Sequence, residues 1–75
     1  MNHRLRIQLG WSDGALVRLL GHTERRGFPL VGVSANPSGP TTLMVDLKVQ
    51  ADRPVDQLIH QLSKLYDVQQ IERTQ

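Results

Sequence analysis

Three histidines are the residues of this sequence best suited to metal binding or proton transfer, and they lie far apart at His3, His22 and His60. No two of them have the i, i+4 spacing with which one helix presents a pair of metal ligands. Ser12 and Asp13, together with His22, are the residue types of a hydrolase triad, but no nucleophile-elbow motif surrounds the serine. The chain has no cysteine, which excludes thiolate ligands. We therefore expect no catalytic residue, no metal site and no cofactor on this chain, and we do not expect it to be an enzyme.

The segment Trp11–Ala15 is the other place where binding chemistry could occur. It leads into a pattern of helical spacing, and a helix start offers unpaired N–H groups and the positive end of a dipole. Gly14 would let a ligand approach this backbone closely, and such a site suits the carboxylate of a small acid. In a simpler alternative, Ser12 caps the helix and Gly14 has no role of its own.

Two periodic patterns predict the elements that flank this segment. Apolar and polar residues alternate over residues 5–9, which predicts a half-buried strand. The apolar spacing then becomes helical and predicts a helix over about residues 13–26, begun by one of the N-cap residues Ser12 and Asp13. Gly27 is the expected C-cap.

The middle of the chain predicts a β-hairpin. Residues 28–36 read as a strand in which Pro29 indicates an edge position and Gly32 indicates a bulge. A dense turn signal over residues 36–40 leads into a clearly alternating strand over residues 41–50.

A second helix opens with Pro54 at its first helical position and runs to Asp67, and a short strand over residues 68–73 ends the pattern. The order β-α-β-β-α-β predicts the α+β class and a ferredoxin-like fold, with a four-stranded antiparallel sheet and two helices on one face. We expect one domain over residues 1–75.

Composition favours a small cytoplasmic protein that completes its core with a partner. The chain has 75 residues and a net charge of +2, so a single thin core is expected. The lack of cysteine argues against a secreted, disulfide-stapled domain. No stretch approaches the ~20 apolar residues that cross a bilayer, so we expect no membrane association.

The same element order also builds the RNA-binding RRM module, which stacks bases on aromatic residues of its central strands. The aromatic residues here are Trp11, Phe28 and Tyr66, and none lies in the first or third predicted strand. Arg4 and Arg6 could contact phosphate, but a solvated strand face explains them as well. We expect no nucleic-acid partner and keep an RNA-binding domain as the weakest alternative.

Three blocks of the sequence resemble the ACT domain, and more closely the regulatory small subunit of acetolactate synthase (acetohydroxyacid synthase). That family reads Gly-Ala-Leu-x-Arg on its first helix, Arg-Gly-Tyr/Phe before its second strand, and Gln-Leu-x-Lys-Leu-x-Asp-Val before its last strand. The corresponding blocks are residues 12–20 (SDGALVRLL), 25–28 (RRGF) and 61–68 (QLSKLYDV). The resemblance extends over about residues 5–73.

The resemblance implies a regulatory subunit that does no chemistry and activates the acetolactate synthase catalytic subunit in branched-chain amino-acid biosynthesis. Thiamine diphosphate, Mg and FAD are then expected on the catalytic partner. ACT domains of the family form homodimers side by side. An effector such as valine, leucine or isoleucine binds between the first loop of one protomer and the second strand of the other.

Carried over residue by residue, the resemblance places effector binding at Trp11, Ser12, Asp13, Gly14, Ala15 and Pro29. We expect the self-pairing edge at Phe28, Leu30, Val31, Gly32 and Val33, because an apolar edge strand has unpaired backbone groups. Trp11 and Phe28 are candidate aromatic anchors; in the alternative, Phe28 belongs to the core.

Two departures concern the polar end of the effector. Feedback-sensitive members carry asparagine where this chain has Trp11 and again where it has Pro29, and they carry a second, C-terminal domain. The departures imply the short isozyme-II-like type, which activates without strong valine inhibition. A free-standing amino-acid-sensing ACT domain that regulates another enzyme is the main alternative.

Overall fold

The structure, a computed structural model, describes residues 1–74, and over these residues the element order is the expected β-α-β-β-α-β. The bounds are β1 Asn2–Gly10, α1 Ala15–Arg25, β2 Leu30–Pro37, β3 Thr42–Gln50, α2 Val55–Leu62 and β4 Val68–Thr74. No helix of the described part is both long and apolar enough to cross a membrane.

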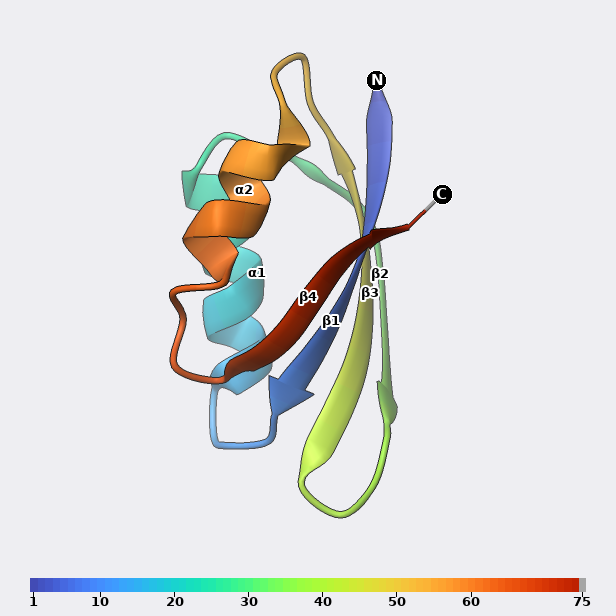
Figure 1. The fold of residues 1–75 in the computed structure, drawn as a ribbon, viewed down its shortest axis with the longest axis vertical. Coiled ribbons are helices and arrows are strands. Elements are labelled where there is room, and N and C mark those ends of the chain that lie inside the picture. Colours follow the sequence, from blue (N-terminus) through green and yellow to red (C-terminus); the bar gives the residue numbers. More distant parts are fainter. Residues whose placement is uncertain (75) are drawn as a thin grey trace.

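The strands form one antiparallel sheet in the order β2-β3-β1-β4, and both helices pack on the same face of it (Figure 1). The ferredoxin-like fold and the β2–β3 hairpin predicted from the sequence are therefore confirmed. β2 is an edge strand, as Pro29 indicated. The register of β2 on β3 shifts between Leu30 and Gly32, where the sequence predicted a bulge.

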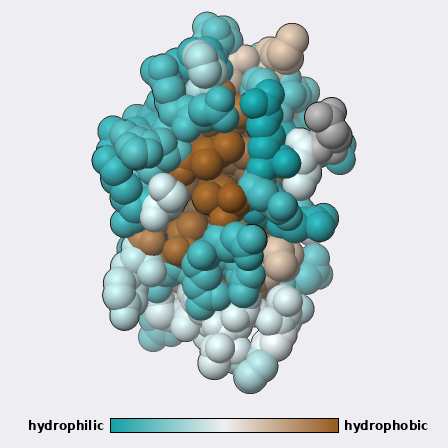
Figure 2. All heavy atoms as spheres, viewed as in Figure 1, coloured by the Kyte–Doolittle hydropathy of each residue, from teal (hydrophilic) through white to brown (hydrophobic). Residues whose placement is uncertain are grey.

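The strand alternation directs apolar side chains to the helix-covered face of the sheet. Leu5 pairs with Leu47 and Ile7 pairs with Val45 across the β1–β3 ladder, and these four side chains are buried. Val55, Leu58 and Leu62 of α2, together with Ala15 and Leu19 of α1, cover the sheet from above. Apolar atoms also reach the surface in a stripe between α2 and β4 (Figure 2). Around that side of the core lie the half-buried residues Ile59, Leu65, Val68 and Ile71.

The C-terminal end of α1 is set by the backbone conformation of Gly27. Gly27 has a positive φ of 84°, and its N–H donates to the Glu24 carbonyl at 2.9 Å while the Phe28 N–H donates to the Thr23 carbonyl at 3.3 Å. This pair of bonds is a Schellman motif, in which Arg26 is the C-cap, one position before the predicted C-cap, and Gly27 is the left-handed residue directly after it. The motif also turns Phe28 into the core, where it is 2% exposed.

Three predicted helix boundaries are wrong. α1 begins at Ala15 and not at residue 13, because Gly14 at its N-cap has a left-handed backbone with φ 78°. α2 ends at Leu62 and not near Asp67. The Lys64 and Leu65 N–H groups there bond carbonyls three residues back, and this tightens the chain into turns. Pro54 precedes α2 as its N-cap, with a ψ of 128°, and is not its first helical residue.

Candidate functional site

The β1–α1 loop is held at one end of the sheet, between the residues that precede β3 and β4. The Gly10 N–H donates to the Asp67 carbonyl at 2.7 Å, and the Trp11 N–H donates to the Thr41 carbonyl at 2.9 Å. The loop is thereby fixed to the start of β4 on one side and to the hairpin on the other. Gly14 then starts α1 with a left-handed backbone that a residue with a side chain adopts only at a cost.

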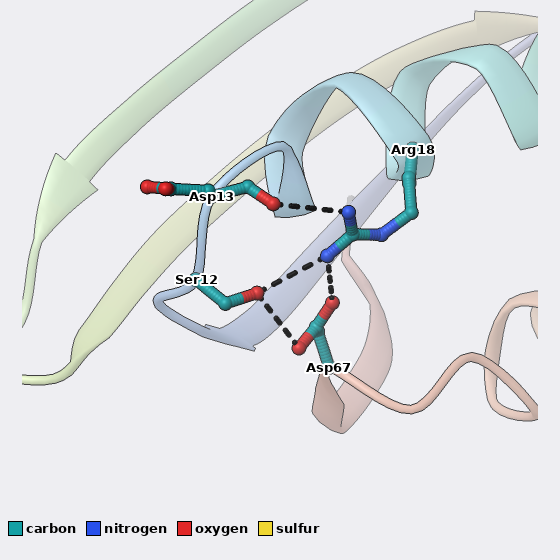
Figure 3. A network of polar contacts seen from close by, with 4 residues as sticks. All are labelled: Ser12, Asp13, Arg18 and Asp67. Carbon is teal, nitrogen blue, oxygen red and sulfur yellow. Dashed lines mark hydrogen bonds and ion pairs between the residues drawn. The ribbon is translucent and has the colours of Figure 1, made fainter.

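Arg18 organises this loop through its guanidinium group (Figure 3). Its Nη1 donates to the Asp13 carbonyl at 3.0 Å, and its Nη2 donates to the Ser12 hydroxyl at 3.1 Å and to the Asp67 carboxylate at 2.7 Å. The Ser12 hydroxyl in turn donates to the second oxygen of Asp67 at 3.1 Å. The network joins the start of α1 to the residue that precedes β4.

The charge state of the network is set by Asp67. Hydrogen bonding to Arg18 is the largest influence and lowers the pKa of the Asp67 carboxyl. Desolvation opposes this shift, and Ser12 reinforces it. The carboxylate side chain is only 14% exposed, whereas the Arg18 side chain is 55% exposed. The Asp67 carboxylate is therefore shielded from solvent, whereas the outer edge of the Arg18 guanidinium is accessible to a ligand.

The simpler alternative for this loop, in which Ser12 caps the helix, is wrong. α1 has no side-chain cap, because the Ser12 hydroxyl is engaged with Arg18 and Asp67. Gly14 also has a definite role. A Cβ at that position would lie 3.0 Å from Nη1 of Arg18, so the glycine gives the guanidinium room to lie against the loop.

The chemistry available at this loop is anion recognition. The first N–H groups of a helix have no partner within it, and the Arg18 guanidinium adds a full positive charge beside them. A carboxylate is the ligand type that this combination suits. Arg18 did not stand out in the sequence as a site residue. The signal that could have singled it out is that Arg18 and Asp67 are oppositely charged residues in two of the three family-like blocks.

Trp11 lies beside the network and faces the hairpin. Its side chain is 60% exposed and lines a hollow of about 260 Å³. The other residues that line the hollow are Pro37, Gly39, Pro40, Thr42 and Leu43. The wall is mainly apolar, so this hollow suits an aliphatic group better than a charged one.

Pro29 lies at the opposite end of the sheet from the other expected effector residues. Gly10 is opposite Thr42 at one end of the β1–β3 ladder, and Asn2 is opposite Gln50 at the other. The Gln50 N–H donates to the Pro29 carbonyl at 3.0 Å, which places Pro29 at the Gln50 end. The eight residue steps of β1 between these ends cover about 26 Å. The structure thus brings residues 11–15 together and separates Pro29 from them within one chain.

The expected pairing edge is open along β2, with one exception. Val31 and Val33 are 50% and 44% exposed on this edge strand. Phe28 was expected to belong to the same interface, and that expectation is wrong. Its ring is buried beneath the end of α1, because the Schellman motif directs it inward before β2 begins. Of the two candidate aromatic anchors, Trp11 alone lies at the surface.

The histidines and the aromatic residues are the remaining candidates that the sequence offered. No group of three His, Cys, Asp or Glu side chains within residues 1–74 could hold a metal ion. Burial, followed by the charges of Arg26 and Arg25, lowers the pKa of His22. The aromatic residues of the described chain all lie outside the strands: Trp11 in the first loop, Phe28 in the core and Tyr66 in the turn after α2. The helix-free face therefore lacks the stacking platform that RRM domains use.

Similar folds occur in several solved structures. The acetolactate synthase small subunit from Thermotoga maritima superimposes with a TM-score of 0.86 at 19% sequence identity, over 97% of this chain and 47% of that one. This chain thus spans about half the length of that subunit. The ACT domain from GTP pyrophosphokinase of Chlorobium tepidum gives a TM-score of 0.80 at 17% identity, over 99% of this chain and 97% of that one.

A third neighbour is the C-terminal domain of the MgtC protein from Mycobacterium tuberculosis, with a TM-score of 0.74 at 15% identity, over 97% of this chain and 84% of that one. At these identities the likeness is one of fold. No curated protein matches the sequence. The sequence profile of the ACT domain matches residues 12–71, from the Ser12 of the network to the middle of β4. The chain therefore belongs to the ACT domain family.

Proposed function

We propose that this chain is a non-catalytic regulatory subunit that binds and activates the acetolactate synthase catalytic subunit. The observation that carries the proposal is the Arg18–Asp67 ion pair at 2.7 Å. It joins one residue from each of two of the three sequence blocks that resemble acetolactate synthase small subunits. The resemblance then lies in residues that contact each other, and not only in apolar positions that any ACT domain needs. The likeness in fold to the Thermotoga maritima small subunit supports the same proposal.

The proposed working form is a homodimer that pairs through β2. Antiparallel pairing about a two-fold axis places the start of one β2 beside the end of the other. Pro29 of a second copy would then lie near the Trp11 end of the first, which brings together the residues that one chain holds apart. The exposed edge formed by Leu30, Val31, Gly32 and Val33 would supply the pairing groups.

In this proposal the chain acts by shifting a conformational equilibrium of its partner. It must bind the active form of the catalytic subunit more tightly than the inactive form. Thiamine diphosphate, Mg and FAD would be held by the catalytic subunit. An amino acid bound at the dimer interface would change how strongly this chain favours the active catalytic subunit, provided that the amino acid prefers one geometry of the paired sheets over another.

Co-expression with an acetolactate synthase catalytic subunit tests this proposal. We expect the two chains to co-purify and the rate of pyruvate condensation to rise when this chain is present. A parallel sample with Arg18→Gln, which breaks the loop network, should raise the rate less than the unmodified chain does. Co-purification without a change in rate would contradict the proposed activation.

A free-standing amino-acid sensor is the second candidate. The ACT domain of the Chlorobium tepidum GTP pyrophosphokinase has nearly the same extent as this chain and belongs to a different enzyme. Calorimetric titration with valine, leucine and isoleucine separates the candidates when it is combined with the rate assay. Tight amino-acid binding without any effect on the synthase favours the sensor.

A further inference from the structure

Three arginines without acidic partners line one hollow on the helix side of the molecule. The hollow has a volume of about 540 Å³ and lies where the end of α1 meets the start of α2. Arg25 and Arg26 come from the end of α1, and Arg53 comes from the segment before α2. Residues without formal charge complete the wall: Gly27, Phe28, Gln57, His60 and Gln61.

Most of the other arginines are paired with an acid, which makes three unpaired arginines in one hollow unusual for the molecule. The chain has seven arginines. Of the four outside the hollow, Arg6, Arg18 and Arg73 each have an aspartate within 4.0 Å, whereas Arg4 has none among the described residues. Within residues 1–74, no carboxylate lies that close to any of the three arginines of the hollow. A basic residue in the last turn of a helix is favoured by the helix dipole, which accounts for Arg25. The same helix end favours Arg53, whose guanidinium donates to the Arg26 carbonyl, but it supplies no carboxylate to neutralise the three charges that gather there.

Arg53 is held in place before any ligand arrives. Its guanidinium carbon lies 4.9 Å from the centre of the Phe28 ring, and its Nη2 donates to the Arg26 carbonyl. Gly27 makes this approach possible, because a Cβ there would collide with the same Nη2. A guanidinium fixed in this way loses little conformational entropy when it binds an anion.

The positive potential of the hollow extends to its surroundings. The charges of Arg26 and Arg25 add to burial in lowering the pKa of His22 on α1. The arginines themselves are exposed, and the hollow is open. Small-ligand sites enclose most of their ligand, whereas an open surface rich in arginine is typical of a protein interface.

We propose that this arginine hollow is a docking surface for an acidic segment of a partner protein, with neighbouring Asp or Glu side chains paired to Arg25, Arg26 and Arg53. The inference rests on the proposed function for the identity of that partner, the catalytic subunit. Planar guanidinium groups bind carboxylates through two parallel hydrogen bonds, and the side-chain amides of Gln57 and Gln61 supply further donors. The hollow also lies beside the start of β2, so docking there leaves the rest of the β2 edge free for self-pairing.

The test is an NMR titration of the ¹⁵N-labelled chain with a hexaglutamate peptide at low salt. We expect the amide shifts to concentrate on residues 22–28 and 52–61, and the affinity to fall as salt is raised. The double variant Arg25→Gln/Arg26→Gln should weaken binding by about tenfold, as expected for the loss of two charge contacts. Arg4→Gln is the matched control, because Arg4 is exposed on the helix-free face and should leave the affinity unchanged.

Three outcomes would overturn the proposal. Shifts spread over both faces would mean that the peptide responds to net charge alone. Inorganic pyrophosphate that binds the same residues more tightly than hexaglutamate would indicate a site for a small phosphate ligand. Tighter binding of a single-stranded oligouridine would indicate nucleic acid. The set of amides that shift on the unmodified chain distinguishes these outcomes even if the double variant is unstable.

The same variants separate this proposal from the proposed function. If the synthase catalytic subunit co-purifies equally well with Arg25→Gln/Arg26→Gln and with the unmodified chain, the docking surface is wrong and the function stands. If hexaglutamate binds the hollow as expected but the catalytic subunit does not bind the unmodified chain, the proposed function is wrong and the docking surface stands.

Discussion

The Arg18 guanidinium lies 2.7 Å from the Asp67 carboxylate and ties the first turn of α1 to the residue before β4. Forty-nine residues separate the two in the sequence. The contact closes the loop that carries the candidate effector site against the edge of the sheet. A rigid first loop is what a binding site at a dimer interface requires, because any disorder there would have to be removed on binding.

The stability that this pair provides should depend on pH. Hydrogen bonding to Arg18 lowers the pKa of Asp67 in the folded chain, so the contribution is complete above the ordinary aspartate pKa of about 3.9. It is lost as the pH falls through the lower, folded value. In Arg18→Gln we expect a Tm below that of the unmodified chain at pH 7 and a difference that narrows as the pH is lowered below about 3.9. Thermal melts followed by circular dichroism measure this.

The control for that experiment is Arg6→Gln. The Arg6–Asp46 pair has a similar distance of 3.0 Å, but both side chains are well exposed. Its loss should change the Tm less. An Arg18→Gln deficit that is equally large at pH 7 and pH 2 would contradict the role given to Asp67.

Gly14→Ala should destabilise the fold and disturb the loop network together. A residue with a Cβ in the left-handed region costs about 1–2 kcal/mol, and the new Cβ would lie 3.0 Å from Nη1 of Arg18. Gly39→Ala is the matched variant, since Gly39 also has a positive φ and has nothing within 4 Å of the added Cβ. Urea denaturation should show a loss of stability in both variants. Only Gly14→Ala should also reduce the pH dependence described above, and equal pH profiles would argue against the contact with Arg18.

Val31→Asp should abolish self-association. Val31 is 50% exposed on the free edge of β2, and a carboxylate there would be desolvated between two paired strands. Val17→Asp on α1 introduces the same charge at a position that is 73% exposed and away from that edge. Size-exclusion chromatography with light scattering should show a monomer for the first variant and a dimer for the second. A dimer for Val31→Asp would mean that the chain pairs through another surface.

The double variant Trp11→Asn/Pro29→Asn should gain affinity for valine. Trp11 offers one donor and Pro29 offers none, whereas each asparagine supplies an amide that can bond the polar end of an amino acid. A missing partner costs about 1–3 kcal/mol, so two restored partners should raise the affinity by tenfold or more. Calorimetry on the unmodified chain, on the double variant and on Val17→Asn as a control measures the gain. If the double variant binds valine no better, these two positions do not explain the specificity.

Periodicity was enough to predict the fold, because burial in a small α+β domain follows directly from strand and helix spacing. Leu5, Ile7 and Leu9 are all buried on one face of β1, and Val55, Leu58 and Leu62 are buried on one face of α2. The failures lie where one backbone angle decides the outcome. Gly14 has a left-handed backbone, so α1 begins only at Ala15. Ser12 bonds Asp67 and does not cap the helix as expected. The Schellman motif at Gly27 sends Phe28 into the core and not to the dimer edge.

The candidate site was less predictable than the fold, because its decisive relationships join distant parts of the chain. The sequence located the loop at residues 11–15 but could not show that Arg18 reaches Asp67. It also could not show that Pro29 lies at the far end of the sheet, since that depends on the strand order and the register of β2 on β3. The arginine hollow depends likewise on the antiparallel placement of the two helices, which brings Arg53 beside Arg26.

The strand order β2-β3-β1-β4 places the first strand of the chain in the interior of the sheet. Leu5 pairs with Leu47 on one side and with Arg73 on the other, so both ladders of β1 join residues that are remote in sequence. High contact order of this kind slows folding. During synthesis β1 cannot pair until β3, and then β4, have emerged from the ribosome. Until then its apolar side chains are accessible to chaperones. The nascent chain is therefore most vulnerable to aggregation just before its last strand emerges.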